Sequence, residues 1–149
     1  MIRDDIKTAL VSAMKAGEKP RVGTIRLIQS SLKNRDIELR GKEAGDDDAL
    51  VTDVLQKMIK QRRESIDMYK KGGREELADA EAAEIAVIES FLPEQMSEAE
   101  LGEAIDAIVA ETGAASIKDM GRVMAVLKER HAGKVDMGKA GAAVRGRLA

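Results

Sequence analysis

Few side chains in this sequence have the types and spacing that catalysis requires. His131 is the sole histidine, and no partner at a recognisable spacing would let it act as a general base. Glu81 and Glu84 lie three residues apart, as in helical carboxylate metal sites, but those sites use Glu-x-x-His and no histidine stands at that spacing here. The serines also lack a base that could activate them. The sequence therefore predicts no self-contained catalytic site, no metal and no cofactor.

Basic side chains near the C-terminus could instead bind phosphates. Residues 117–149 contain eight basic and three acidic side chains, and no acidic stretch follows them. Because this segment has no aromatic side chain to stack on a base, we expect it to contact the backbone and shape of a folded RNA. An ordinary solvated basic face is the open alternative. The candidate RNA-binding residues are Lys118, Arg122, Lys128, Arg130, Lys134 and Lys139.

A basic block directly precedes an acidic one in the middle of the chain. Residues 57–74 carry seven basic and two acidic side chains, and residues 75–100 carry nine acidic and none basic. Two helices joined by a tight Gly-Gly turn would run antiparallel and face these charges toward each other. On a helical wheel, Arg62 falls within one apolar stripe, and Glu81 and Glu84 fall within the other. We expect Arg62 to form a structural ion pair with Glu81 or Glu84, since a lone buried charge is costly.

Helical periodicity extends over almost the whole chain. Apolar residues at 2, 6, 10 and 14 fall four apart and predict a first helix that ends near Gly17. Tyr69 and Phe91 are the only aromatic residues. Ser97 followed by Glu100 has the spacing of a capping box at a helix start. The sequence thus predicts an all-α protein of two helical subdomains, with about four helices in residues 1–92 and a three-helix C-terminal lobe in residues 97–149.

The composition limits the cellular setting. Cysteine is absent, which excludes disulfides and thiolate metal sites and suits a reducing compartment. The N-terminal residues are charged and have no apolar signal core, and no uncharged run approaches the length of a membrane span. The expected protein is cytoplasmic and has no membrane partner.

Several stretches resemble the YqeY family, and the likeness covers essentially all 149 residues. The most specific of these stretches are QRRES, KGGR, AAEIAVIESFLP and SIKDMGRVM. The YqeY family is similar to the tail domain of GatB, the B subunit of the tRNA-dependent Asp/Glu amidotransferase. The resemblance implies an all-helical protein of two subdomains, in which tRNA contacts fall on the SIKDMGRVM helix and the GKVDMGKAG turn. It also implies the family label of a carbon–nitrogen ligase with glutamine as amido donor.

The catalytic cradle of the large amidotransferase subunit has no counterpart in this sequence, so only the idea of tRNA contact is carried over. The leading interpretation is a tRNA-associated accessory protein without chemistry of its own. Two alternatives remain open. One is a helical module that binds a protein partner of the translation machinery, with exposed apolar residues near the linker, such as Leu92 and Met96, as possible contacts. The other is a component of a carbon–nitrogen ligase that acts only within a complex.

Overall fold

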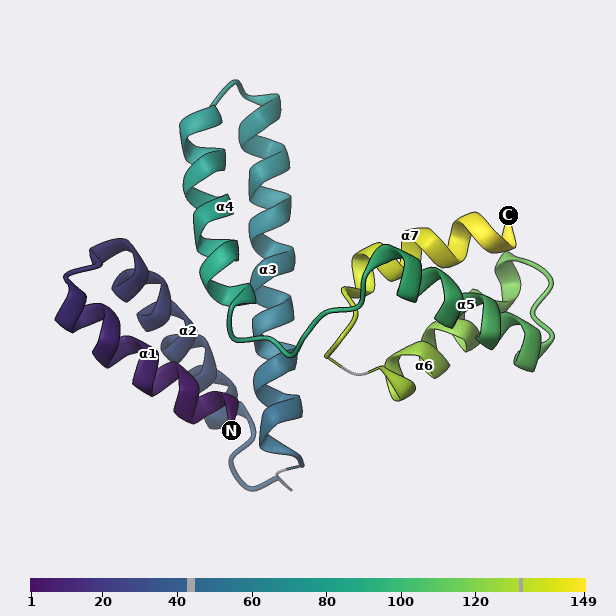
Figure 1. Cartoon of the computed structure of the whole chain (residues 1–149), viewed down its shortest axis with the longest axis horizontal. Helices are drawn as coiled ribbons and strands as arrows, with labels where there is room; N and C mark the ends of the chain where they lie inside the picture. The colour runs from purple at the N-terminus through teal and green to yellow at the C-terminus, as the bar shows by residue number, and fades with distance from the viewer. Residues whose placement is uncertain (43–44, 132) are drawn as a thin grey trace. The chain divides into compact units, whose positions relative to one another are not determined.

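The computed structural model describes residues 1–42, 45–131 and 133–149. All regular secondary structure in these ranges is helical, which confirms the predicted all-α class. The chain divides into two compact units, Met1–Leu92 and Pro93–Ala149. The helices, labelled in Figure 1, are α1 (Ile2–Ala16), α2 (Lys19–Glu38), α3 (Asp47–Lys71), α4 (Glu75–Glu89), α5 (Glu98–Thr112), the 3-10 turn η1 (Ile117–Asp119), α6 (Met120–Arg130) and α7 (Met137–Leu148).

The N-terminal unit consists of two helical hairpins, α1 with α2 and α3 with α4. In Figure 1, α3 and α4 lie side by side along most of their length, and the α1–α2 hairpin packs against their lower part. The turn within each hairpin is tight because it contains a glycine in the left-handed conformation, Gly17 with φ of 69° and Gly73 with φ of 73°. The core contains no aromatic side chain that is fully buried. Its largest fully buried members are Ile6, Ile25, Ile28, Val51, Leu55 and Ile88.

One arginine joins the ends of three helices in this unit. Arg3, in the first turn of α1, donates two hydrogen bonds to Asp47 of α3, at 3.1 and 3.0 Å, and two to Asp36 of α2, at 3.0 and 3.1 Å. The bonds to Asp47, and then those to Asp36, raise the pKa of the Arg3 guanidinium above its ordinary value. The backbone N–H of Ile2 adds a 3.0 Å bond to Asp48. These bonds fix the start of α1 to the rest of the unit.

The C-terminal unit is built from α5, η1, α6 and α7. The capping box predicted at Ser97 is confirmed: its hydroxyl accepts from the Glu100 N–H, and the Glu100 carboxylate accepts from the Ser97 N–H. A second capping box, between Ser116 and Asp119, starts η1, which leads directly into α6. The three α-helices close over a small aliphatic core. Its fully buried members are Ile105, Ile108, Val123, Leu127, Ala140 and Val144.

Candidate nucleic-acid interface

The start of α6 is organised around Asp119. Its carboxylate accepts from the N–H groups of Ala115, at 2.9 Å, and Ser116, at 3.3 Å, and from the guanidinium of Arg122, at 3.0 Å. The backbone bonds from Ala115 and Ser116, in that order, lower the pKa of Asp119. Arg122 therefore has a carboxylate partner three residues away, at the N-cap of its own helix, although its side chain remains 54% exposed.

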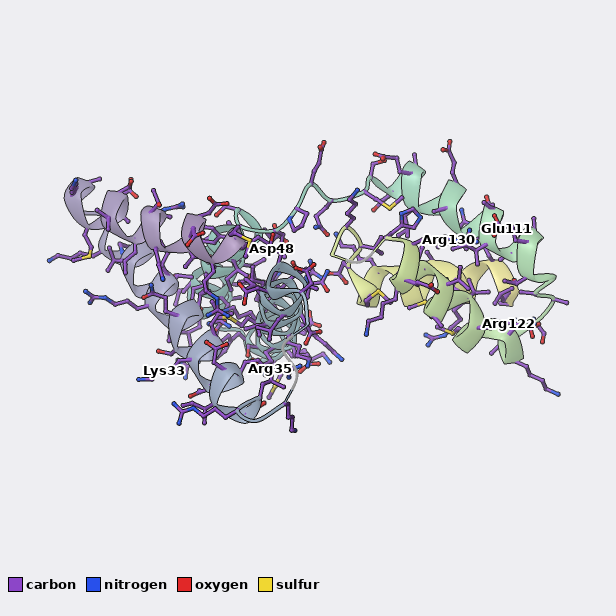
Figure 2. All side chains as sticks on the ribbon, turned by 90° about the horizontal axis from the view of Figure 1, so that it is seen from below. Lys33, Arg35, Asp48, Glu111, Arg122 and Arg130 are labelled. Atoms are coloured by element: carbon purple, nitrogen blue, oxygen red, sulfur yellow. The ribbon has the colours of Figure 1, made fainter. Side chains whose placement is uncertain are left out.

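Two further arginines of the C-terminal unit reach carboxylates on α5. Arg130, at the end of α6, donates to Glu111, and Figure 2 shows the two side chains close together. This bond lowers the pKa of Glu111 and raises that of Arg130. Arg147 of α7 donates to Asp106 at 2.6 Å, and its guanidinium lies directly over Gly102, where any Cβ would meet it at 2.6 Å. Arg130 and Arg147 thus tie α6 and α7 to α5.

The four lysines of the predicted RNA-binding set are placed differently from its arginines. Lys118, Lys128, Lys134 and Lys139 are all exposed, and within the described part of the chain none forms an ion pair with a carboxylate. Lys134 lies in the loop after α6, where its carbonyl accepts from the Met96 N–H at 2.9 Å and so fixes its backbone. Ammonium groups without a partner are available to an external anion.

Counting charges along the sequence did not separate these lysines from the arginines. The carboxylates that engage Arg130 and Arg147 come from α5, which precedes the basic segment, so only the packing of α5 on α6 and α7 reveals the pairing. Arg145, which is exposed on α7, was not in the predicted set. It forms no ion pair among the residues that the structure describes, and it joins the four lysines as a cation open to a ligand.

The expected ion pair of the N-terminal unit involves the second of the two glutamates. Arg62 Nε lies 2.8 Å from Glu84 Oε2, which links α3 to α4. A further 3.3 Å bond joins Arg62 Nη1 to the carbonyl of Met58. The Arg62 side chain is 14% exposed and that of Glu84 is 32% exposed. Glu81 is half-buried and takes no part in this pair. A second bridge between these helices joins Arg63 to Glu89 at 3.6 Å.

No group of three or more His, Asp or Glu side chains suited to a metal ion occurs among the residues described. An open groove of about 440 Å³ runs between α1 and the start of α2, and Asp5, Thr8, Ser12 and Arg21 are among its lining residues. None of the helices described is long and apolar enough to cross a membrane.

The fold and the charges define an all-helical protein of two units, with exposed lysines on the second. The family described as "Yqey-like protein" matches residues 3–148, so the chain belongs to the YqeY family. Its curated relatives include yeast proteins named "Altered inheritance of mitochondria protein 41, mitochondrial". The one from Lachancea thermotolerans is 33% identical over 72% of this chain and 57% of the relative. The one from Kluyveromyces lactis is 37% identical over 58% and 45%. The one from Saccharomyces cerevisiae (strain YJM789) is 29% identical over 68% and 51%. The chain spans about half the length of these relatives.

Proposed function

We propose that this protein is a tRNA-associated accessory factor. It binds the phosphate backbone of a folded RNA, and other proteins carry out the catalysis. The observation that carries the proposal is the set of four exposed lysines in the C-terminal unit that no carboxylate of the described chain neutralises. Lysine binds phosphates as a point charge, and the absence of aromatic side chains from this unit favours backbone contacts over base stacking. The likeness of the family to the amidotransferase tail domain supports tRNA as the RNA.

The tRNA proposal predicts a strong dependence of affinity on salt. If each of the four lysines neutralises one phosphate, together they contribute about −3.6 to the slope of log K against log salt concentration. Raising salt from 50 to 200 mM would then weaken binding about 150-fold through these lysines alone. A protein that binds only a protein partner gives no such response with purified tRNA.

The test is fluorescence anisotropy of labelled tRNA titrated with the full chain at several salt concentrations. The C-lobe variant replaces Lys118, Lys128, Lys134 and Lys139 with Gln. The control variant makes the same change of charge at four exposed lysines of the N-terminal unit that have no ion-pair partner in the described chain, namely Lys7, Lys15, Lys60 and Lys70. We expect the C-lobe variant to flatten the slope by about 3 to 4 and the control variant to leave it unchanged. Absence of tRNA binding by the unmutated protein at low salt refutes the proposal.

We also propose a cytoplasmic location, as the sequence predicts. The names of the yeast relatives place those proteins in mitochondria. Imaging of a fusion that carries the fluorescent protein at the C-terminus distinguishes the two, and a signal confined to an organelle would contradict the cytoplasmic location.

A further inference from the structure

Helix α2 is tightly packed along one face and carries an excess of positive charge. Residues 19–35 contain five basic side chains and no acidic one. One face of the helix is completely buried, with Ile25 and Ile28 at 0% and Leu32 at 3% exposure. This face packs against the other helices of the unit, so the basic side chains must divide between the edges of the packed face and the solvent.

Two of these five basic residues serve the packing of the unit. The Arg21 guanidinium lies over the Phe91 ring, 5.9 Å from its centroid. Arg35 reaches Asp53 of α3 at 3.5 Å. Figure 2 shows Arg35 among the helices, whereas Lys33, two residues earlier, points away from them. The remaining basic residues of the helix are therefore not needed for its packing.

The outward basic residues follow one another at intervals of seven. Lys19, Arg26 and Lys33 are exposed, and Arg40, in the turn just after the helix, continues the interval. Seven residues make two helical turns less about 20°, so Lys19, Arg26 and Lys33 share one face of the helix. The rise of about 1.5 Å per residue places Lys19 and Lys33 about 21 Å apart along the axis. None of these four residues, called here the α2 stripe, forms an ion pair within the described chain.

One nearby carboxylate could have neutralised the α2 stripe, and the fold diverts it. Asp36 stands three residues after Lys33 on α2, which is the spacing of ion pairs along a helix. Both of its carboxylate oxygens instead accept hydrogen bonds from Arg3 of α1, at 3.0 and 3.1 Å. Arg3 thereby holds the charge of Asp36 at the junction of the helices and leaves the stripe positive.

The side chains between these cations indicate the kind of partner. Gly23 and Ser30 lie on the same face, and both are exposed, with nothing within 4 Å of a Cβ built on Gly23. Two large apolar side chains are exposed on α2, Leu27 at 46% and Ile37 at 45%. Ile37 lies on the stripe face, whereas Leu27 lies about 100° around the helix axis from Arg26. A protein partner would need apolar or aromatic anchors at the centre of its interface, and this face has almost none. A polyanion needs only cations, close approach and hydroxyl donors, all of which the face provides.

We propose that the α2 stripe is a second RNA-binding surface, which contacts the phosphate backbone independently of the lysines in the C-terminal unit. It shares the ligand class of the proposed function but rests on other residues in another unit, so either surface can fail alone. Four phosphate contacts by the stripe would contribute about −3.6 to the salt slope for duplex regions of the RNA.

The first experiment measures the salt slope for labelled tRNA with a stripe variant of the full chain, in which Lys19, Arg26, Lys33 and Arg40 are replaced by Gln. The C-lobe variant and the control variant with changes at positions 7, 15, 60 and 70 are measured in parallel. The substituted side chains are exposed, so far-UV circular dichroism should match the unmutated protein. We expect the stripe variant to flatten the slope by about 3 to 4.

The parallel variants separate the two proposals. Loss of slope in the stripe variant but not in the C-lobe variant supports the stripe and refutes the proposed role of the four lysines, and the reverse result overturns the stripe. An equal loss in the control variant shows a general effect of net charge and also overturns it. A stripe variant that retains the salt slope for tRNA overturns the proposal as well. If that variant also loses binding to poly-glutamate, an acidic polypeptide, the surface recognises protein instead of RNA.

A crosslinking experiment locates the RNA without relying on charge changes. Because the chain has no cysteine, Ser30→Cys provides a unique site for a photoreactive maleimide at the centre of the α2 stripe. Ser12→Cys, at an exposed position on α1, is the matched control. We expect irradiation to attach labelled tRNA to the Ser30→Cys protein at least several-fold more than to the Ser12→Cys protein. Equal crosslinking at both positions would overturn the proposal.

Discussion

Replacing Glu84 should destabilise the N-terminal unit much more than replacing Glu81, although the two glutamates stand one turn apart on α4. Glu84 holds Arg62 at 2.8 Å, whereas Glu81 takes no part in that pair. Removing the Glu84 carboxylate leaves a guanidinium that is only 14% exposed. Among the described residues, the hydrogen bond that Arg62 then keeps is the 3.3 Å contact with the Met58 carbonyl, which does not balance a full charge.

The size of this effect follows from the burial of the two partners. Breaking a fully buried ion pair costs about 3–5 kcal/mol, and an exposed pair contributes about 0–1 kcal/mol. Arg62 is nearly buried and Glu84 is 32% exposed, so we expect Glu84→Leu to lower the free energy of unfolding by about 2 kcal/mol. The double variant Arg62→Met/Glu84→Leu removes both charges and keeps apolar volume, and should lie within about 1 kcal/mol of the unmutated protein.

The assay exploits the scarcity of aromatic residues. Tyr69 and Phe91 are the only two, and both belong to Met1–Leu92. Tyrosine fluorescence during urea unfolding of the full chain therefore reports the N-terminal unit alone. Glu81→Leu is the matched control and should change the free energy of unfolding by less than about 0.5 kcal/mol. The reasoning is refuted if Glu84→Leu lowers the free energy of unfolding no more than Glu81→Leu does. It is also refuted if the double variant loses as much stability as the single variants Arg62→Met and Glu84→Leu lose when added together.

Three further predictions concern other parts of the molecule. Arg3→Ala should lower the urea-derived free energy of unfolding of the N-terminal unit by about 2 kcal/mol, because it breaks the bonds to Asp36 and Asp47 together; a loss below about 0.5 kcal/mol would contradict that role. The pKa of Asp119 is lower in the folded than in the unfolded state, so its stabilising effect is complete above the ordinary aspartate pKa of about 4 and is lost as pH falls through the lower folded value. Asp119→Ala should therefore weaken the pH dependence of thermal unfolding, followed by far-UV circular dichroism, between about pH 5 and 2, and an unchanged acid limb would be inconsistent with this. Gly121→Ala should stabilise α6 by about 1 kcal/mol, since nothing lies within 4 Å of the added Cβ; a decrease in the melting temperature would show that this helix does not tolerate the methyl group.

Local signals in the sequence predicted the helical architecture well. The all-α class and the capping box at Ser97 depend on residues within one or two turns of each other, so the sequence contains all the information needed. The left-handed glycine at position 17 ends the first helix close to where its periodicity stops. Such features do not depend on contacts between one helix and another.

A strict four-residue spacing does not keep every apolar side chain of the first helix on its buried face. Ile6 is 1% exposed, whereas Met14, at the other end of the same four-residue series, is 53% exposed. Each step of four residues turns the helix about 40° beyond a full circle, so three steps carry a side chain roughly 120° around the axis. Ala13, rather than Met14, occupies the buried position at this end of α1.

The candidate site could be predicted only in part, because the identity of an ion-pair partner is a long-range property. Arg122 obtains its carboxylate from Asp119, the N-cap of its own helix, and a spacing of three residues is typical of such pairs. Arg130 obtains its carboxylate from Glu111, 19 residues earlier on α5. A sequence count treats Arg130 and Lys128 alike. Packing pairs Arg130 with Glu111, whereas Lys128 is exposed and has no ion-pair partner among the residues that the structure describes.

The same distinction explains why a net charge of −2 is a poor guide to whether this protein binds RNA. What a phosphate encounters is the local field of cations that the fold has not already neutralised. In the N-terminal unit, Asp36 and Asp47 are both bound by Arg3, and Asp53 is shared between Arg35 and Lys57. These carboxylates count fully toward the net charge but are held at helix junctions. Asp36 stands at ion-pair spacing from Lys33 but is bound by Arg3, which leaves the α2 stripe positive. Arg3→Ala, by releasing Asp36 toward Lys33, should therefore also weaken RNA binding at this surface.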